Sequence, residues 1–438
     1  MRAHAAFFLL LLAPLASAKW VTAWTGSVQG PYPTGNPLAQ PNLSLVFPAA
    51  ETGARDQSFR MIVRPDIWGA QTRLRFSNAL GTKPVTFDGV FAGLQMSGAA
   101  IMPGTNRPVH FGGKATVTVA PGESAWSDPV ALPFVKGTAT ELMGRKLAVS
   151  FHISGESGPM TWHAKSLTSS YVTAPGAGSK GRDENESAFP FATTSWYFLD
   201  ALDMTAGDSA RLIVAFGDSI TDGTASTLNG DDRWPDVLSR RLHARWGNEI
   251  AIVNTGIGGN RVVGPKEYTA AKSFAGGPSS KMRLERDVLS LSGVFAVIWM
   301  EGINDLEYTN DSGQTESVES IQAGYREGVA RIRAKFPGVR VIGGTLTSAL
   351  GSKSNGGRGT PEGDTKRKAI NEFIRHTDLF DGVADFDKAT LDPRTGELRP
   401  EFVPDSTIGG PGDKLHPNRL GYQAMGNAVN VELFVNKK

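Results

Sequence analysis

The spacing of apolar residues changes near residue 208, and this change constrains the fold more than any other feature of the sequence. Before it, apolar residues recur at every second position in short runs, a pattern typical of half-buried strands. These runs lie at 59–63, 73–76, 115–119 and 147–153, with clusters of Gly, Pro and Asn between them. We therefore expect residues 19–207 to form an antiparallel β-sandwich of the jelly-roll type.

After residue 208 the pattern becomes an alternation of strands and helices. It predicts strands at 211–216, 250–253, 294–300, 339–346 and 383–386, and helices at 234–246, 318–336, 366–376 and 418–434. Such an alternation predicts right-handed crossovers and a doubly wound parallel sheet. We expect residues 208–438 to be an α/β domain, with its ligand site beyond the carboxyl ends of the strands.

Length and charge exclude several classes of protein. A chain of 438 residues suits two domains, and its net charge of +2 provides no strong field for nucleic acid or an anionic membrane. We expect no nucleic-acid partner, no stable membrane association and a monomer. Cysteine is absent, which excludes disulfides and thiolate chemistry.

The first 18 residues predict export from the cell. Arg2 and His4 precede a short apolar run at 5–12, and small residues at 16–18 suit cleavage by a signal peptidase. We predict that residues 1–18 form a signal peptide, that the mature chain starts near Lys19 and that the protein is secreted and extracellular. Three Asn-x-Ser sequons, at Asn42, Asn185 and Asn310, predict a glycoprotein, although such tripeptides also arise by chance.

Four short segments follow predicted strands or precede a predicted helix, so they are expected to meet at one edge of the sheet. Taken singly, each segment could be an ordinary turn or helix cap, but four such segments at the same edge of the sheet argue against coincidence. The segments are Phe-Gly-Asp-Ser-Ile-Thr-Asp-Gly at 216–223, Asn-Thr-Gly-Ile-Gly-Gly-Asn at 254–260, Gly-Ile-Asn-Asp at 302–305 and Asp-Lys-Leu-His at 413–416.

The residue types in these segments suit acyl transfer through a serine. The hydroxyl of Ser219 needs a base, and His416 can act as one near neutral pH. Asp413 stands three residues earlier and can accept the other ring proton. Attack on an ester creates an oxyanion, for which the N–H of Ser219, the N–H of Gly259 and the amide of Asn304 are candidate donors.

The segments resemble blocks I, II, III and V of the SGNH (GDSL-type) hydrolase superfamily. Two stretches of sequence, Arg-Trp-Pro-Asp at 233–236 and Leu-His-Pro-Asn at 415–418, resemble those of secreted two-domain members with an N-terminal β-domain. The resemblance implies a flavodoxin-like three-layer α/β/α catalytic domain without metal or cofactor. It implies Ser219, Asp413 and His416 as the triad, and Ser219, Gly259 and Asn304 as the oxyanion hole. Register alone favours Gly259 over Gly256 and Gly258, and no Gly-x-Ser-x-Gly elbow is present.

Other polar and aromatic residues receive less specific interpretations. His110, His152 and His163 are expected in surface or satisfied polar positions, and His243 and His376 on the solvent side of helices. Trp24, Trp162 and Trp196 are expected in the core rather than in a sugar platform. Glu301 and Asp305 are expected to brace the third segment.

Two other functions stay open. A metal-dependent phosphoesterase could use Asp218, Asp222, Asp305, Asp413 and His416 as ligands, but it would leave Ser219 and Asn304 without a role. An inactive carbohydrate-binding protein is the non-enzymatic alternative. For the esterase, we expect an acylated carbohydrate as substrate, with acetyl as the favoured group. The reason is that 261–281 predicts a polar wall instead of an amphipathic lid. A lipase or acylhydrolase acting on lipid or aryl esters is the alternative.

Overall fold

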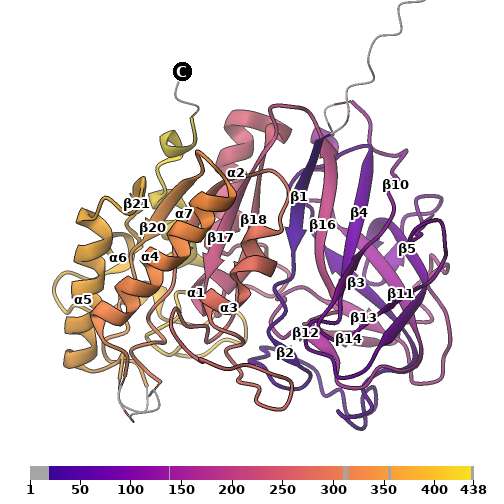
Figure 1. Ribbon diagram of the computed structural model, residues 1–438, viewed down its shortest axis with the longest axis horizontal. Helices are drawn as coiled ribbons and strands as arrows, with labels where there is room; N and C mark the ends of the chain where they lie inside the picture. Colours follow the sequence, from indigo (N-terminus) through magenta and orange to yellow (C-terminus); the bar gives the residue numbers. More distant parts are fainter. Residues whose placement is uncertain (1–18, 138, 309–312, 314, 354–356, 436–438) are drawn as a thin grey trace, which may run out of the picture.

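The computed structural model describes residues 19–137, 139–308, 313, 315–353 and 357–435. The predicted signal peptide, residues 1–18, and the sequon at Asn310 lie outside the described residues. Two parts lie side by side, a β-rich part built from residues up to about 207 and an α/β part built from the rest (Figure 1). They are called the β-half and the α/β-half below, and the domain boundary at 207/208 stays a prediction.

The β-half contains antiparallel sheets, as the alternating pattern predicts. The first sheet has the order β1 (Lys19–Thr25), β16 (Leu199–Ala206), β4 (Gln71–Ser77) and β10 (Val130–Ala131), with β9 (Ser124–Trp126) beside β4. The second has the order β14 (Phe191–Thr193), β13 (Ser170–Val172), β3 (Arg55–Val63), β11 (Leu147–Glu156), β5 (Val85–Ser97) and β6 (Ala100–Ile101), with β7 (Arg107–Pro108) and β8 (Val117–Val119) beside β5. A third, small sheet joins β15 (Trp196–Tyr197), β12 (Thr161–His163) and β2 (Gly30–Pro31). Phe76 of the first sheet meets Phe151 of the second edge to face, with ring centroids 5.2 Å apart.

The central strands of the second sheet are buried on both faces, so the expectation of half-buried strands is wrong there. In β3 and β11 the polar residues that alternate with the apolar ones are also buried. Arg60 donates from Nε to Ser150 Oγ at 2.8 Å, and from Nη1 to the carbonyl of Ala99 at 2.6 Å. His152 lies between the carboxylates of Asp56 and Asp88, which matches a satisfied polar position but not an exposed one.

The α/β-half contains a five-stranded parallel sheet. Its order is β18 (Ile250–Gly256), β17 (Arg211–Gly217), β19 (Val294–Met300), β20 (Arg340–Gly344) and β21 (Gly382–Ala384). In chain order this is 2-1-3-4-5, the doubly wound arrangement of flavodoxin-like folds. The fold class predicted from the sequence is therefore confirmed.

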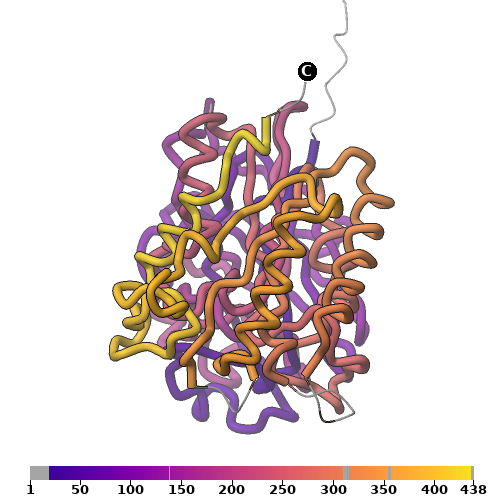
Figure 2. The backbone as a smooth tube through the Cα atoms, turned by 90° about the vertical axis from the view of Figure 1, so that its left-hand side faces the viewer, coloured from indigo at the N-terminus to yellow at the C-terminus, as the bar shows by residue number. Residues whose placement is uncertain are grey.

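Helices cover both faces of this sheet. One core joins the sheet to α2 (Trp234–Trp246), α6 (Phe386–Thr390) and α7 (Arg419–Ala428). The other core joins it to α3 (Ser280–Leu284), α4 (Val318–Lys335) and α5 (Pro361–His376). Along β17, Ile213 and Ala215 belong to the first core, whereas Leu212, Val214 and Phe216 belong to the second. Figure 2 shows the α/β-half from its outer side, with the β-half behind it.

The structure corrects three expectations about helices. One helix, α5, begins at Pro361 and not at residue 366. The last helix ends at Ala428 and is followed by a separate 3₁₀ turn, Val431–Phe434, so 418–434 is not one helix. His243 on α2 does not face solvent, because its Nε2 lies 3.1 Å from Asp66 Oδ2 in the β-half. Among the described residues, no helix is long and apolar enough to cross a membrane.

Polar contacts cross the boundary between the halves. Strand β1 lies at the boundary (Figure 1), where the Thr22 N–H donates to the carbonyl of Ser292 at 3.0 Å. Asp66 accepts hydrogen bonds from Ser239 Oγ at 2.5 Å and from the Ile252 N–H at 2.7 Å. Because these groups are buried and paired across the boundary, the halves fit together as one packed body.

Candidate active site

Ser219 is the first residue of α1 (Ser219–Asp222), directly after β17. The side chain of Asp218 caps this short helix by accepting from the Ile220 N–H at 2.9 Å. Burial raises the pKa of Asp218 to about 8. Gly223 ends the helix with φ 102°, in the region that favours glycine. The turn therefore presents Ser219 at the carboxyl end of the first strand of the sheet.

His416 bridges Ser219 and Asp413. Its Nε2 lies 2.8 Å from Ser219 Oγ, and its Nδ1 lies 2.6 Å from Asp413 Oδ2. Because the Asp413 carboxylate accepts the proton on Nδ1, Nε2 is left as the acceptor for the serine hydroxyl. This is the arrangement that a serine nucleophile and its base require.

The ionisation of both groups favours this arrangement. Burial alone would raise the pKa of Asp413, but the hydrogen bonds from His416 and from the Leu415 N–H hold it well below its usual range. Burial lowers the pKa of His416, with help from the positive charges of Lys165 and Arg358 and against the pull of Asp413. His416 is therefore neutral, and able to accept a proton, at neutral pH.

The three glycines of the second segment meet different surroundings. A Cβ on Gly256 would lie 2.2 Å from the Asp222 backbone nitrogen, so this glycine lets β18 pack against α1. A Cβ on Gly258 would lie 2.8 Å from Lys165 Nζ. Gly259 has φ 82°, which a larger residue would adopt only with strain. The role of Gly259 as an oxyanion donor stays a prediction.

Asn304 is joined to the second segment. Its Nδ2 donates to the carbonyl of Asn260 at 2.9 Å, and its Oδ1 accepts from Arg358 Nη1 at 2.5 Å. Asp305 braces the chain as expected, because it accepts from the N–H groups of Val262 and Val263, each at 2.9 Å. The Glu301 side chain accepts from Trp299 Nε1 at 2.9 Å and from Ser280 Oγ, so it links the end of β19 to α3 rather than bracing the third segment directly.

The β-half contributes residues that the sequence motifs did not identify. His163 and Asp222 form a buried ion pair, with Nε2 and Oδ1 3.1 Å apart. Lys165 Nζ donates to Thr224 Oγ1 at 2.5 Å, and burial lowers the pKa of Lys165. Asn36 Nδ2 donates to the carbonyl of Gly258 at 2.9 Å. No local pattern marks these three residues, because their partners lie far along the chain.

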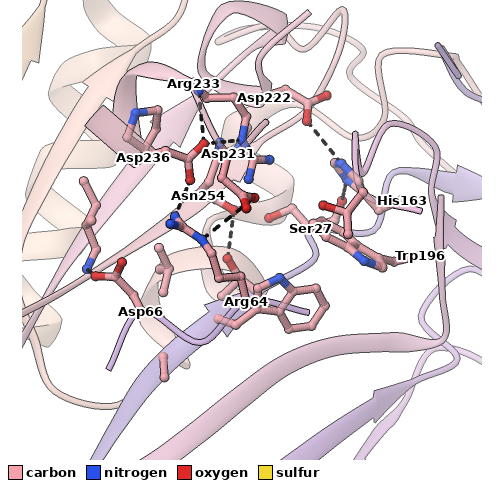
Figure 3. A pocket seen from close by; sticks show the side chains of 18 residues that line it. Ser27, Arg64, Asp66, His163, Trp196, Asp222, Asp231, Arg233, Asp236 and Asn254 are labelled. Carbon is pink, nitrogen blue, oxygen red and sulfur yellow. Dashed lines mark hydrogen bonds and ion pairs between the residues drawn. The ribbon is translucent and has the colours of Figure 1, made fainter. Parts of the chain in front are cut away.

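A small polar cavity lies at the boundary between the halves and is lined in part by Asp222 of α1. Its volume is about 40 Å³, and Figure 3 shows His163 and Asp222 on one side and Arg64, Arg233 and Asp236 on the other. The Oγ of Ser27 is buried there without a partner among the described residues. A cavity of this size and polarity suits ordered water rather than a substrate.

The carboxylates that a metal site would need have other partners. Asp218 caps its helix, Asp222 pairs with His163, Asp305 binds two backbone N–H groups and Asp413 pairs with His416. Within the part of the chain that the structure describes, no group of three or more His, Cys, Asp or Glu residues could hold a metal ion.

Comparisons with known proteins found one family match and several similar solved structures. Residues 215–424 match the GDSL-like lipase/acylhydrolase family. No curated protein matches the chain. Among solved structures, a lipase/acylhydrolase from Enterococcus faecalis is similar at 23% identity and a TM-score of 0.35, over 50% of this chain and 92% of that one. An α/β hydrolase from the metagenome of Lake Arreo, Spain, is similar at 22% identity and a TM-score of 0.36, over 51% and 95%. An acetyl xylan esterase is similar at 16% identity and a TM-score of 0.34, over 50% and 96%.

Proposed function

We propose that this chain, a carboxylic ester hydrolase whose residues 215–424 form a GDSL-like lipase/acylhydrolase domain, removes acetyl or other short acyl groups from a carbohydrate. In this proposal Ser219 is the nucleophile, His416 the general base and Asp413 the residue that orients His416. One observation carries the assignment: His416 contacts Ser219 Oγ with one ring nitrogen and Asp413 with the other. No cofactor is needed for this chemistry.

The reaction follows from these positions. As Ser219 Oγ attacks the ester carbonyl, His416 Nε2 takes the hydroxyl proton and becomes an imidazolium that Asp413 stabilises. The carbonyl oxygen becomes an oxyanion, which the N–H groups of Ser219 and Gly259 and the amide of Asn304 stabilise. The C–O bond to the alcohol then breaks, and His416 returns the proton to the leaving alcohol. Water repeats these steps on the acyl-enzyme, which releases the acid and restores Ser219.

The surroundings of the site support a short acyl group. Residues 261–279 contain no helix or strand, so no amphipathic lid covers the site from this segment. Lys266, Glu267 and Lys272 are exposed on this segment, whereas Arg261 is buried against the rings of Phe274 at 4.8 Å and Tyr308 at 5.3 Å. The outer side of this wall is therefore charged and not aliphatic. A polar wall suits a small acyl group on a hydrated alcohol better than a long lipid chain.

Replacement of Ser219 tests the nucleophile. Ser219→Ala should keep the fold and lose activity by about 10⁴-fold or more, as when triad members are removed from other serine hydrolases. Ser209→Ala is a matched control, because Ser209 is exposed and precedes β17, whereas Ser219 follows it. Hydrolysis of 4-nitrophenyl acetate at the wild-type rate by Ser219→Ala would contradict the proposal.

The acyl preference needs its own experiment. Rates should be highest for acetyl and should fall as the acyl chain of 4-nitrophenyl esters lengthens, and acetate should be released from acetylated polysaccharides. A rate maximum at eight carbons or beyond would instead support the lipase alternative. Faster hydrolysis of aryl acetates than of every acetylated polysaccharide would favour an arylesterase.

We also propose that the protein acts outside the cell as a glycoprotein. The sequons at Asn42 and Asn185 are exposed, and in each the Asn side chain accepts from a backbone N–H two residues later. The mature protein should begin near Lys19, and a glycosidase should lower its mass. Recovery of an unglycosylated protein that still begins at Met1 would contradict both parts.

A further inference from the structure

Both amide groups that would bind the oxyanion accept a hydrogen bond at their own oxygen. Asn36 Nδ2 donates to the carbonyl of Gly258, which belongs to the same peptide group as the Gly259 N–H. Arg358 Nη1 donates to Asn304 Oδ1, which belongs to the same amide as Nδ2. Neither Asn36 nor Arg358 lies in the four sequence segments. We propose that Asn36 and Arg358 are positioning residues that orient and polarise the two amides of the oxyanion hole, an inference that rests on the proposed function.

Arg358 and the carbonyl of Asn260 together fix which way the Asn304 amide faces. A guanidinium has donors but no acceptor, so the atom that it contacts must be the amide oxygen. The amide nitrogen then faces the carbonyl of Asn260, to which it gives one of its two hydrogens at 2.9 Å. The second hydrogen is left for the substrate. Without Arg358, the carbonyl of Asn260 would hold the amide at its nitrogen only, and the direction of the second N–H would be fixed less firmly.

Asn36 acts in the same way on the peptide between Gly258 and Gly259. In a trans peptide the C=O and N–H point in opposite directions, so fixing the oxygen also fixes the direction of the Gly259 N–H. Asp222 Oδ2 holds the preceding N–H, that of Gly258, at 3.0 Å. The Gly259 N–H has no acceptor among the described residues. The loop is therefore held from the β-half by Asn36 and from α1 by Asp222.

A donor at the oxygen of an amide also strengthens its N–H as a donor, because hydrogen bonds in a chain polarise one another. The effect is larger for Arg358, since a charged donor makes a stronger bond than a neutral one. Arg358 has a second influence: its positive charge lowers the pKa of His416. Loss of Arg358 should therefore change both the turnover number and the pH profile, whereas loss of Asn36 should change the turnover number alone.

Single and double variants test the proposal with 4-nitrophenyl acetate. Arg358→Ala and Asn36→Ala should each lower kcat by about 10- to 100-fold and leave KM nearly unchanged, within the 10²-fold that a displacement of about 1 Å can cost. In an Asn304→Ala background, Arg358→Ala should have little further effect, because the amide that it orients is gone. Asn36→Ala should keep its full effect there, because it acts through a different amide.

Matched variants separate positioning from loss of fold. Gln40→Ala removes another amide of the same N-terminal segment, which bonds within the β-half. Arg399→Ala removes an exposed arginine of the α/β-half. Both should keep wild-type kcat. If the alanine variants unfold, Arg358→Lys and Asn36→Ser replace them in the test. Both keep a hydrogen-bond donor at the position and should therefore keep part of the wild-type kcat.

Two results would overturn the inference: wild-type kcat in both alanine variants, or an Arg358→Ala loss that multiplies in full with that of Asn304→Ala. Ser219→Ala distinguishes failure of this inference from failure of the proposed function. If Ser219→Ala stays active, the proposed function fails. If Ser219→Ala is inactive while the Arg358 and Asn36 variants match the wild type, only the positioning roles fail.

Discussion

The buried ion pair between His163 and Asp222 links the β-half to the helix that carries Ser219. The Nδ1 of His163 lies 2.7 Å from the carbonyl of Ser27, and its Nε2 lies 3.0 Å from the carbonyl of Lys165 and 3.1 Å from Asp222 Oδ1. Carbonyl oxygens only accept, so both ring nitrogens carry hydrogen and His163 is an imidazolium. Although burial alone would lower the pKa of His163, Asp222 raises it above the ordinary value.

His163→Ala should destabilise the protein strongly. The exposed fractions of the two side chains are 3% and 2%, so the variant leaves a buried carboxylate without its partner. Breaking such a pair costs about 3–5 kcal/mol. For a chain of 438 residues that unfolds as one unit, the entropy of unfolding is about 0.9 kcal/mol/K, which converts this cost into a fall in Tm of roughly 3 to 6 °C.

The effect of His163→Ala should depend on pH. Because the pKa of His163 is raised in the folded state, its stabilising contribution is fully present below the ordinary histidine pKa of about 6.5. It is lost as the pH rises through the folded-state value. The gap in Tm between the wild type and His163→Ala should therefore be largest near pH 6 and should narrow at alkaline pH.

Differential scanning calorimetry between about pH 6 and pH 9.5 measures this gap. His376→Ala is the matched control, because the His376 side chain is 72% exposed and its ion pair with Glu372 lies at the surface. It should change Tm little at any pH. A His163→Ala gap below 1 °C, or one that widens as the pH rises, would refute the reasoning.

Three further predictions concern catalysis and architecture. Asn304→Ala should lower kcat by about 10²- to 10³-fold with little change in KM, and a variant that loses affinity but keeps its turnover number would contradict its role. As the pH falls, kcat/KM should decline with a midpoint below about pH 6.5, because burial and the charges of Lys165 and Arg358 lower the pKa of His416, although the carboxylate of Asp413 opposes this shift. A midpoint above about pH 7 would exclude a lowered pKa of His416. Limited proteolysis should cut within 351–363 before residue 207, and early cleavage at 207 would instead indicate independent domains.

Local pattern predicts the five strands and the four longer helices of the α/β-half, but not the short helices α3 and α6. The strand predicted at 294–300 and the helix predicted at 234–246 have the observed bounds, because both segments show a clear period and clear ends. The contact between Asp413 and His416 could also be predicted from sequence, since a carboxylate and an imidazole only three residues apart can meet through a local turn. The last helix was predicted too long because apolar residues continue past Ala428 into the 3₁₀ turn.

Tertiary contacts explain what the sequence could not predict. His152 and Arg60 alternate with apolar residues as exposed side chains do, yet carboxylates and backbone carbonyls from other segments cover them. Asn36 and Arg358 lie in segments rich in Gly and Pro, where polar residues usually only form turns. Their partners, Gly258 and Asn304, stand 222 and 54 residues away. The spacing of apolar residues does not reveal contacts between residues so far apart in the sequence.

The contacts across the boundary also bear on why one chain contains both halves. Asp66 of the β-half accepts from Ser239 Oγ and the Ile252 N–H, so an isolated α/β-half would lose the acceptor of two buried donors. The isolated α/β-half would also lose the hydrogen bond from Asn36 to the carbonyl of Gly258. It would lose His163 as well, which is the partner of Asp222, the residue whose carboxylate accepts from the Gly258 N–H. The loop that contains Gly259 would then be fixed less firmly, and stabilisation of an oxyanion depends on donors that are already in place. The β-half therefore contributes to the geometry of the site itself, in addition to any contact with the substrate.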